Sequence, residues 1–154
     1  MDNFPRLNLP ALVAPVLRRD GDMVRIYDGC RNAYVKLTPE EWVRQHFVGY
    51  LCGVLGYPRS IIGNEVSLRL NNLSRRADTV VYDRHGEPFI IVEYKAPHVD
   101  ITQEVFDQIV RYNMVLRARY LAVSNGLRHY CCAIDYAAGS YAFVAQLPAY
   151  GDMV

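Results

Sequence analysis

Two acidic residues and a lysine in the middle of the chain have a spacing that suits metal-dependent hydrolysis. Asp78 begins one apolar segment, and Glu93 and Lys95 end the next. If Tyr82 pairs with Phe89 across the intervening turn, Asp78 falls directly opposite Glu93, with their Cβ atoms about 4.5–5.5 Å apart. Lys95, two residues beyond Glu93, projects from the same face of the strand. The three side chains are therefore expected to form one polar group.

Such a group has a natural use in binding a divalent cation. Two partly buried carboxylates repel each other unless one keeps its proton or both share a cation. Mg²⁺ is typically held by carboxylates together with water and substrate phosphate. The lysine could then orient or deprotonate an attacking water, or stabilise charge on phosphoryl oxygens. The pattern thus predicts a Mg²⁺ site that Mn²⁺ could also fill. The alternative is a cross-strand salt bridge in which Lys95 only neutralises its acidic neighbours.

The elements around these residues indicate a small mixed fold. Thr38 is a good N-cap, Pro39 suits the first helical position, and Glu41 completes a capping box, so a helix begins there. The uninterrupted apolar run before Glu93 indicates a strand buried on both faces. We expect strands at 24–27, 33–37, 61–70, 78–82, 89–94, 120–123, 128–134 and 141–146, and a second helix over 101–116. A helix between two neighbouring strands implies a crossover, hence an α/β or α+β sandwich with a mixed sheet.

The bulk properties limit the function classes. The 154 residues have the size of one domain, with residues 1–22 expected as an irregular, Pro-rich N-terminal arm packed on a single domain of residues 23–154. No apolar run is long enough to span a bilayer, and the N-terminus lacks a secretory pattern, which predicts a cytoplasmic protein and no membrane partner. The four cysteines form no C-x-x-C pair, which argues against a zinc site.

The charge balance speaks against a dedicated DNA-binding module. The net charge is +1, with 17 basic and 16 acidic side chains. Nucleic-acid-binding domains usually carry a basic excess, because phosphate neutralisation dominates their affinity. Carboxylates of a nuclease site would offset its basic residues, so the balance predicts weak binding by this domain alone.

Several segments, in order, resemble a known family. Asp78 followed by Ile91-Val92-Glu93-Tyr94-Lys95 resembles the signature of the PD-(D/E)XK nuclease superfamily, with Ala77 in place of the proline. More narrowly, the chain resembles the N-terminal nuclease domain of type I restriction enzyme R subunits and its stand-alone relatives over roughly residues 38–135. The segments that carry this resemblance are Thr38–Gln45, Leu55–Pro58, Arg76–Asp78, Val92–Pro97, Gln108–Tyr112 and Ser124–Gly126.

The resemblance implies a restriction-endonuclease-like core, with a central mixed sheet flanked by helices, and Mg²⁺-dependent hydrolysis of DNA phosphodiesters. It implies Asp78 and Glu93 as metal ligands and Lys95 as the catalytic lysine. An acidic residue on the first helix often completes such sites, and Glu41 is the candidate. The capping box explains Glu41 equally well.

The second helix carries further candidates. Gln108 and Tyr112 match a Gln-x-x-x-Tyr element of related nucleases and share a helix face. We expect the apolar line of this helix to be Val105, Ile109, Tyr112 and Leu116. Gln108 would interrupt that line as a buried amide that needs a partner, either at the catalytic site or in the core. Arg111, Tyr112 and the nearby His98 are candidate nucleic-acid contacts, although Arg111 could equally be a solvated surface residue.

These observations leave two main function hypotheses. The first is a Mg²⁺-dependent endonuclease or nuclease subunit that acts on DNA. Motor or modification subunits of a restriction system would be its partners, and a homodimer would supply two sites for two strands. The second is a catalytically inactive nuclease fold that binds nucleic acid or a protein. A structural ion cluster formed by Asp78, Glu93 and Lys95 in an unrelated protein is a third reading.

Overall fold

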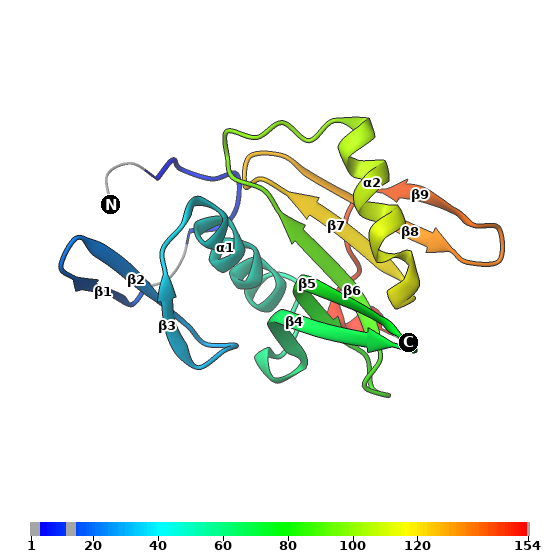
Figure 1. Cartoon of the computed structure of the whole chain (residues 1–154), viewed down its shortest axis with the longest axis horizontal. Helices are drawn as coiled ribbons and strands as arrows, with labels where there is room; N and C mark the ends of the chain where they lie inside the picture. The colour runs from blue at the N-terminus through cyan, green and yellow to red at the C-terminus, as the bar shows by residue number, and fades with distance from the viewer. Residues whose placement is uncertain (1–3, 12–14, 154) are drawn as a thin grey trace.

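The computed structural model describes residues 4–11 and 15–153, apart from the side chain of Leu70. The described chain forms a small sheet of strand order β1-β2-β3 and a large sheet of order β4-β5-β6-β7-β8-β9 (Figure 1). The helices are α1 (Pro39–Gly53) and α2 (Gln103–Asn113), with short 3₁₀ turns at Arg59–Ile61, Met114–Leu116 and Tyr150–Asp152. No helix in the described ranges is long and apolar enough to cross a membrane.

The small sheet contains the predicted hairpin and one strand that was not predicted. β2 (Met23–Asp28) pairs antiparallel with β3 (Ala33–Lys36), as expected. β1 (Leu17–Asp20) pairs with β2 across a two-residue turn, so the expectation of an irregular segment up to residue 22 is wrong for this stretch. Gly21 in this turn has φ +63°, the conformation that tight hairpin turns require.

The described part of the N-terminal arm contacts the large sheet and α1. The Asn8 N–H donates to the carbonyl oxygen of Gly126 at 2.8 Å, and the Trp42 indole donates to the carbonyl oxygen of Pro5 at 3.2 Å. The Leu7 side chain is buried in the same core as Val43 and Phe47 of α1. These contacts fix the arm over the loop that follows β7 (Tyr120–Ser124).

The large sheet is mixed, as predicted. β4 (Ile62–Leu70), β5 (Leu73–Tyr82) and β6 (Pro88–Tyr94) form an antiparallel meander. α2 then crosses over to β7, which lies parallel to β6. β8 (His129–Asp135) and β9 (Ser140–Val144) complete the sheet in antiparallel order. The α+β architecture with a central mixed sheet is therefore confirmed.

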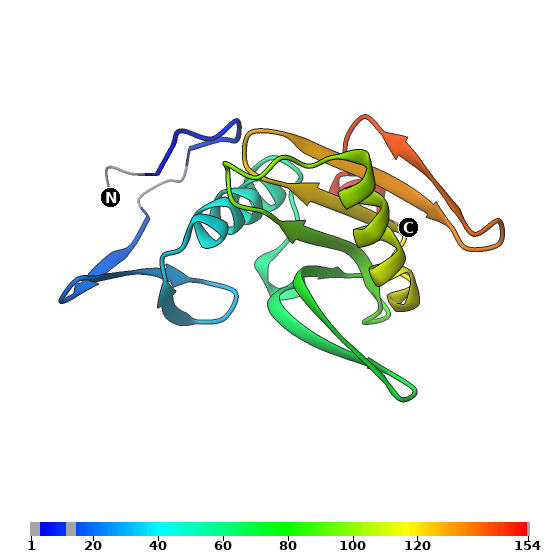
Figure 2. The ribbon, with the colours of Figure 1, turned by 45° about the horizontal axis from the view of Figure 1, so that its top comes forward.

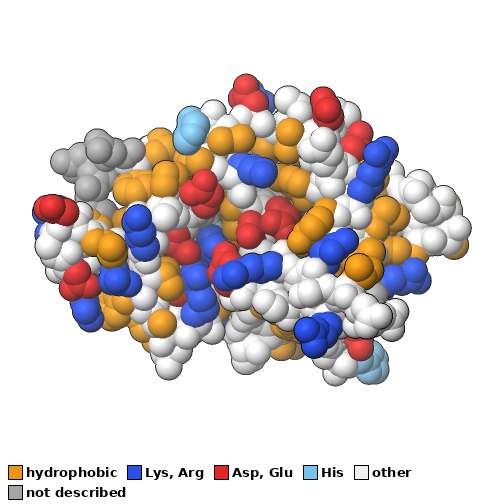
Figure 3. All heavy atoms as spheres, in the orientation of Figure 1, with side chains coloured by type: hydrophobic (Ala, Val, Ile, Leu, Met, Phe, Trp, Pro, Cys, Tyr) orange, Lys and Arg blue, Asp and Glu red, His pale blue; other side chains and the backbone are white. Residues whose placement is uncertain are grey.

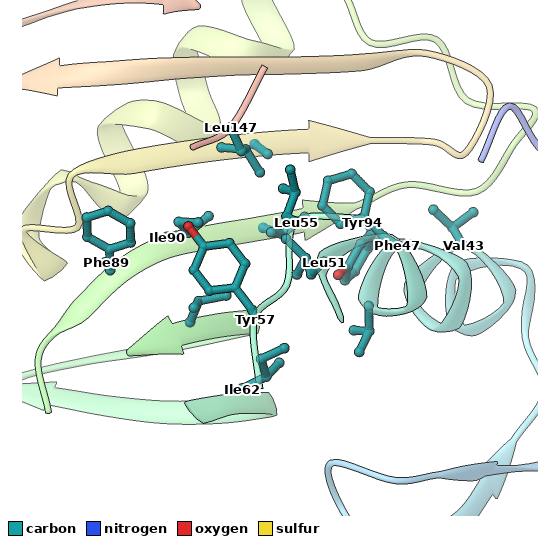
Figure 4. Packing of buried hydrophobic residues seen from close by; sticks show 14 of the residues in the cluster. Val43, Phe47, Leu51, Leu55, Tyr57, Ile62, Phe89, Ile90, Tyr94 and Leu147 are labelled. Carbon is teal, nitrogen blue, oxygen red and sulfur yellow. The ribbon is translucent and has the colours of Figure 1, made fainter. Parts of the chain in front are cut away.

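The two helices lie on opposite faces of the large sheet. Val43, Phe47 and Leu51 of α1 pack against a cluster that includes Ile90 and Val92 of β6 (Figure 4). The core on the other face contains Phe106 and Val110 of α2 with Val80, Ile91 and Val123. Ile90, Ile91 and Val92 of β6 thus alternate between the two cores, as expected for a central strand covered on both faces.

The register of β5 and β6 matches the prediction except at the turn. Val81 pairs with Ile90 and Thr79 with Val92, which is the predicted register. Tyr82, however, pairs with Pro88 instead of Phe89, because the register shifts between Val81 and Tyr82. The shift lies on the turn side of the ladder, so the predicted alignment near Asp78 survives.

The buried line of α2 differs from the prediction. Phe106, Val110 and Asn113 are the buried residues, whereas Tyr112 is 46% exposed. The sequence contains two adjacent apolar pairs, Val105-Phe106 and Ile109-Val110, so helical periodicity allows two phases one residue apart. The structure adopts the phase that buries the larger side chain, Phe106.

Candidate active site

Asp78 and Glu93 lie on the same face of the large sheet, under α2. Val80 and Ile91 form a cross-strand pair whose side chains enter the core beneath α2. Asp78 and Glu93 each lie two residues from one member of this pair, and side chains two apart share a face. Lys95 follows just beyond the end of β6, where its backbone N–H donates to the Ser124 carbonyl oxygen at 2.9 Å.

Asp78 is held from two directions. Its Oδ2 accepts from the backbone N–H of Tyr94 at 2.9 Å, and its carbonyl oxygen accepts from Nη1 of Arg44 at 2.6 Å. The Tyr94 hydroxyl in turn donates to Oγ1 of Thr79 at 2.9 Å. The backbone and the carboxylate of Asp78 are therefore both fixed before any ligand arrives.

Glu93 is the least compensated acid at this place. Its Oε1 is buried, and no hydrogen-bond donor among the described residues reaches it. Burial, and then the neighbouring Asp78 carboxylate, raise the pKa of Glu93 to about 9, while the Lys95 ammonium and the Asn113 amide act in the opposite direction. A carboxyl group so placed favours a proton or a cation over an uncompensated charge.

The donor set fits a hard cation with an open coordination sphere. Within residues 4–11 and 15–153, no group of three or more His, Cys, Asp and Glu side chains could hold a metal ion, so a closed protein cage is not present there. Mg²⁺ usually keeps several waters and needs only one or two carboxylates plus substrate phosphate. The bare Oε1 of Glu93 beside Asp78 is the feature that fits such an ion.

Glu41 lies in a different environment. Its backbone N–H donates to Oγ1 of Thr38 at 3.1 Å, which confirms the predicted N-cap. Its buried carboxylate accepts from Arg31 at 2.6 Å and Gln45 at 2.9 Å, and Nε of Arg44 lies 3.2 Å away. Because α1 covers the sheet face opposite to that of the acidic pair, the structure does not bring Glu41 into the group. Its catalytic role stays a prediction.

The remaining predicted residues are exposed. Gln108 faces solvent, so its interpretation as a buried amide is wrong, because the other phase of α2 is the buried one. Arg111 and His98 are also exposed. Tyr112 carries the guanidinium of Arg75 over its ring, 4.6 Å from the ring centre. The site roles of these residues stay predictions.

Two supporting residues were missed by sequence reasoning. Asn113, only 2% exposed, is the α2 side chain that lies beside Glu93. The sequence signal that could have identified Asn113 is its spacing: it is a polar residue three positions after Val110, in line with the buried residues of α2. Arg44, on α1, is buried and reaches the Asp78 carbonyl. A helical arginine gives no sequence signal that separates it from a surface residue.

One face of the molecule is mixed in charge. Figure 3 shows acidic side chains near the centre of one face, with Lys and Arg side chains around them. This distribution is consistent with a centre that attracts a cation and a rim that can meet a polyanion.

Comparisons with known proteins give a consistent result. No curated protein sequence matches the chain. A solved structure, described as a fragment of an HsdR subunit of a type I restriction enzyme from Vibrio vulnificus YJ016, superimposes with a TM-score of 0.52 at 18% identity. The match covers 76% of this chain and 24% of that chain, so this chain spans only a part of such a subunit.

The similarity at this identity establishes the fold, and the family assignment comes from a sequence profile. The profile of the type I restriction enzyme R protein N terminus matches residues 39–148, well over half of the chain. The matched range includes all eight predicted site residues. The chain therefore belongs to the family of type I restriction enzyme R protein N-terminal domains.

Proposed function

We propose that this domain is a Mg²⁺-dependent nuclease that hydrolyses phosphodiester bonds of DNA in a restriction system. The observation that carries the proposal is the Asp78–Glu93 pair, two adjacent carboxylates of which one has a buried oxygen that no donor in residues 4–11 and 15–153 reaches. Membership in the family of R protein N-terminal domains supports the restriction context. Lys95, beside the pair, supports hydrolysis rather than cation storage.

Each residue has a distinct part in this chemistry. A bound Mg²⁺ would supply Lewis-acid activation of the phosphoryl group and of water. Asp78, within β5, and Glu93, near the end of β6, would hold that ion. The Lys95 ammonium stabilises the negative charge that grows on the phosphoryl oxygens as water adds to phosphorus. The attacking water gives up a proton, the bond from phosphorus to the leaving oxygen breaks, and that oxygen takes up a proton, which leaves a phosphate monoester and a hydroxyl end.

Partners are proposed from the same relation. The chain matches about a quarter of the HsdR fragment structure, so translocation on DNA would depend on other parts of a restriction enzyme. Cleavage of both strands would need two sites, supplied by two copies of the domain. Arg111, Tyr112 and His98, all exposed, are proposed DNA contacts at the rim.

Plasmid cleavage with Mg²⁺ or Mn²⁺ tests the proposal. Lys95→Ala should fold normally and lose at least about 100-fold of the cleavage rate, the usual effect of removing one group that stabilises developing charge. Lys36→Ala is the matched control, because Lys36 is the other lysine of the chain and lies exposed on β3. Cleavage by Lys95→Ala at the wild-type rate would refute the assignment.

The second candidate function is a nuclease fold without activity that binds nucleic acid or a protein. It is favoured by one observation: the acid expected from the first helix, Glu41, pairs with Arg31 and Arg44 instead of joining Asp78 and Glu93. Absence of divalent-cation binding by the wild-type protein would support this candidate over a nuclease.

A further inference from the structure

Arg44 connects α1 to the backbone of Asp78 and to Tyr94, whose N–H holds the Asp78 carboxylate. Its side chain is nearly fully buried, and its Nη1 donates to the carbonyl oxygen of Asp78 at 2.6 Å. Nη2 donates to Glu65 at 2.5 Å. The guanidinium lies 5.6 Å from the centre of the Tyr94 ring, and the Tyr94 N–H holds Oδ2 of Asp78. The Arg44 guanidinium thus fixes the backbone of Asp78 and also packs on Tyr94, the residue that holds the Asp78 carboxylate.

Glu65 lies opposite Asp78 at an irregular point of the β4–β5 ladder. The pairs Asn64–Thr79 and Val66–Ala77 flank this position in one register, while Glu65 itself has φ +55°. Residues other than Gly, Asn and Asp seldom adopt this left-handed backbone conformation. Figure 2 shows the β4–β5 hairpin extending away from the rest of the large sheet. Backbone strain of this kind persists only where the surroundings enforce it.

The Arg44–Glu65 ion pair supplies that enforcement. Arginine can bridge a backbone carbonyl, a carboxylate and an aromatic ring because its guanidinium is planar and carries five N–H donors. A lysine at this position keeps the charge but has a compact ammonium group that cannot make the three contacts together. Groups that orient metal ligands typically change metal affinity by about 10- to 100-fold when altered.

We propose that Arg44 is a positioning residue that, together with Glu65, sets the place of the Asp78 carboxylate. Arg44 does not touch substrate or metal, and it acts through the carbonyl of Asp78 and the ring of Tyr94. The role as a support for metal binding rests on the proposed function. The placement of the Asp78 carboxylate by Arg44 does not depend on the proposed function, because it concerns the metal-free protein.

The first measurement uses metal-free protein. Hydrogen exchange of the Tyr94 amide, followed by NMR, reports the bond from this amide to Oδ2 of Asp78. In Arg44→Lys the Tyr94 amide should exchange at least about tenfold faster than in wild type, as for a bond whose partner has moved. Arg76→Lys is the matched control, because Nε of Arg76 bonds the same Glu65 carboxylate at 2.7 Å from the solvent side. The control should leave Tyr94 exchange unchanged.

The second measurement is Mn²⁺ affinity by calorimetry. Arg44→Lys should bind Mn²⁺ about 10- to 100-fold more weakly than wild type, and Arg76→Lys should match wild type. Glu65→Gln, which keeps Arg44 but weakens its anchor, should fall between them. Glu65→Gln also replaces Arg44→Lys as the test variant if Arg44→Lys does not fold.

The outcomes separate the inference from the proposed function. Unchanged Tyr94 exchange and unchanged Mn²⁺ affinity in a folded Arg44→Lys variant, or in Glu65→Gln if that variant replaces it, would overturn the inference. Faster Tyr94 exchange in a protein whose wild type binds no Mn²⁺ would uphold the positioning of Asp78 and refute the metal site. Faster exchange together with weaker Mn²⁺ binding would support both.

Discussion

Two groups of buried or half-buried carboxylates lie in the described part of this molecule, and they are compensated in opposite ways. In the first, Asp28, Glu41 and Glu65 each accept from an arginine at 2.5–2.7 Å. In the second, Asp78 accepts from a backbone N–H, and the Oε1 of Glu93 has no donor among the described residues. Glu41, the acid expected at the site from resemblance, belongs to the first group.

The difference separates structural acids from candidate functional ones. A buried charge whose partner is present stabilises little by itself, but removing the partner leaves an unpaired charge and costs much. A pair of acids without such partners costs free energy in the metal-free protein and persists where function requires it. The two groups should therefore respond in opposite directions to substitution.

The largest expected effect is the loss of stability on breaking the compensated group. Asp28 is 1% exposed and accepts from Arg31, Asn64 and the Cys30 N–H. Asp28→Ala should lower the free energy of unfolding by about 3–5 kcal/mol, because the Asn64 amide and the Cys30 N–H lose their acceptor and Arg31 keeps only Glu41 as a partner. Urea denaturation measures this loss. Asp20→Ala, which removes two solvent-accessible ion pairs of the small sheet, should leave the midpoint almost unchanged. Equal urea midpoints for Asp28→Ala and Asp20→Ala would contradict the structural role of the buried, arginine-paired acids.

The next effect concerns the pH dependence of the uncompensated group. The pKa of Glu93 is raised in the folded protein from its ordinary value of 4.5, so the folded state holds a proton that the unfolded chain releases. The metal-free protein should therefore lose stability as pH rises from about 4.5 toward the raised pKa, by at most about 1.4 kcal/mol per pH unit. Glu93→Gln should remove this contribution.

Denaturation in urea with a chelator, at several pH values between 5 and 8.5, checks this sign. Glu93→Gln should be the more stable protein at pH 8, and the difference should shrink toward pH 5. Added Mn²⁺ should restore wild-type stability at pH 8 and have less effect on the variant. A wild type that gains stability relative to Glu93→Gln as pH rises would contradict the account.

A smaller effect is expected at the rim of the site. Arg75 stacks on the exposed Tyr112, next to Asn113 and three residues from Asp78. Arg117 stacks in the same way on Tyr136, 4.4 Å from the ring centre, just before the start of β7. Arg75→Ala should weaken binding of a labelled DNA duplex about three- to tenfold, in Ca²⁺ and low salt, by loss of one phosphate contact. Arg117→Ala should bind as wild type, and fluorescence anisotropy distinguishes the two. Equal losses in both variants would show only a nonspecific effect of charge.

The sequence was informative where a local pattern determines structure. The pairing assumed across the turn predicted the register that aligns Asp78 with Glu93, and the observed pair Thr79–Val92 has this register, although Tyr82 itself pairs with Pro88. The N-cap at Thr38 was also correct. Both depend on the chain within a few residues, where side-chain chemistry limits the backbone directly.

What the sequence could not supply depends on contacts across the fold. The phase of α2 was ambiguous because two apolar lines fit the helix, and only packing chose the line that buries Asn113 and exposes Gln108. Glu41 matches the sequence pattern of a capping box, yet its carboxylate pairs with Arg31, ten residues earlier, and not with the Thr38 N–H. Arg44 bonds Glu65 across 21 residues. Such partners follow from tertiary structure, not from spacing.

Calorimetric titration with Mn²⁺ tests the central claim most directly, because it asks whether the uncompensated acids and not the compensated ones hold a cation. Three proteins suffice: wild type, Asp78→Ala and Glu41→Gln. We predict saturable binding by wild type, loss of binding in Asp78→Ala, and retained binding in Glu41→Gln. Equal binding by wild type and Asp78→Ala, or no binding by wild type, would contradict it.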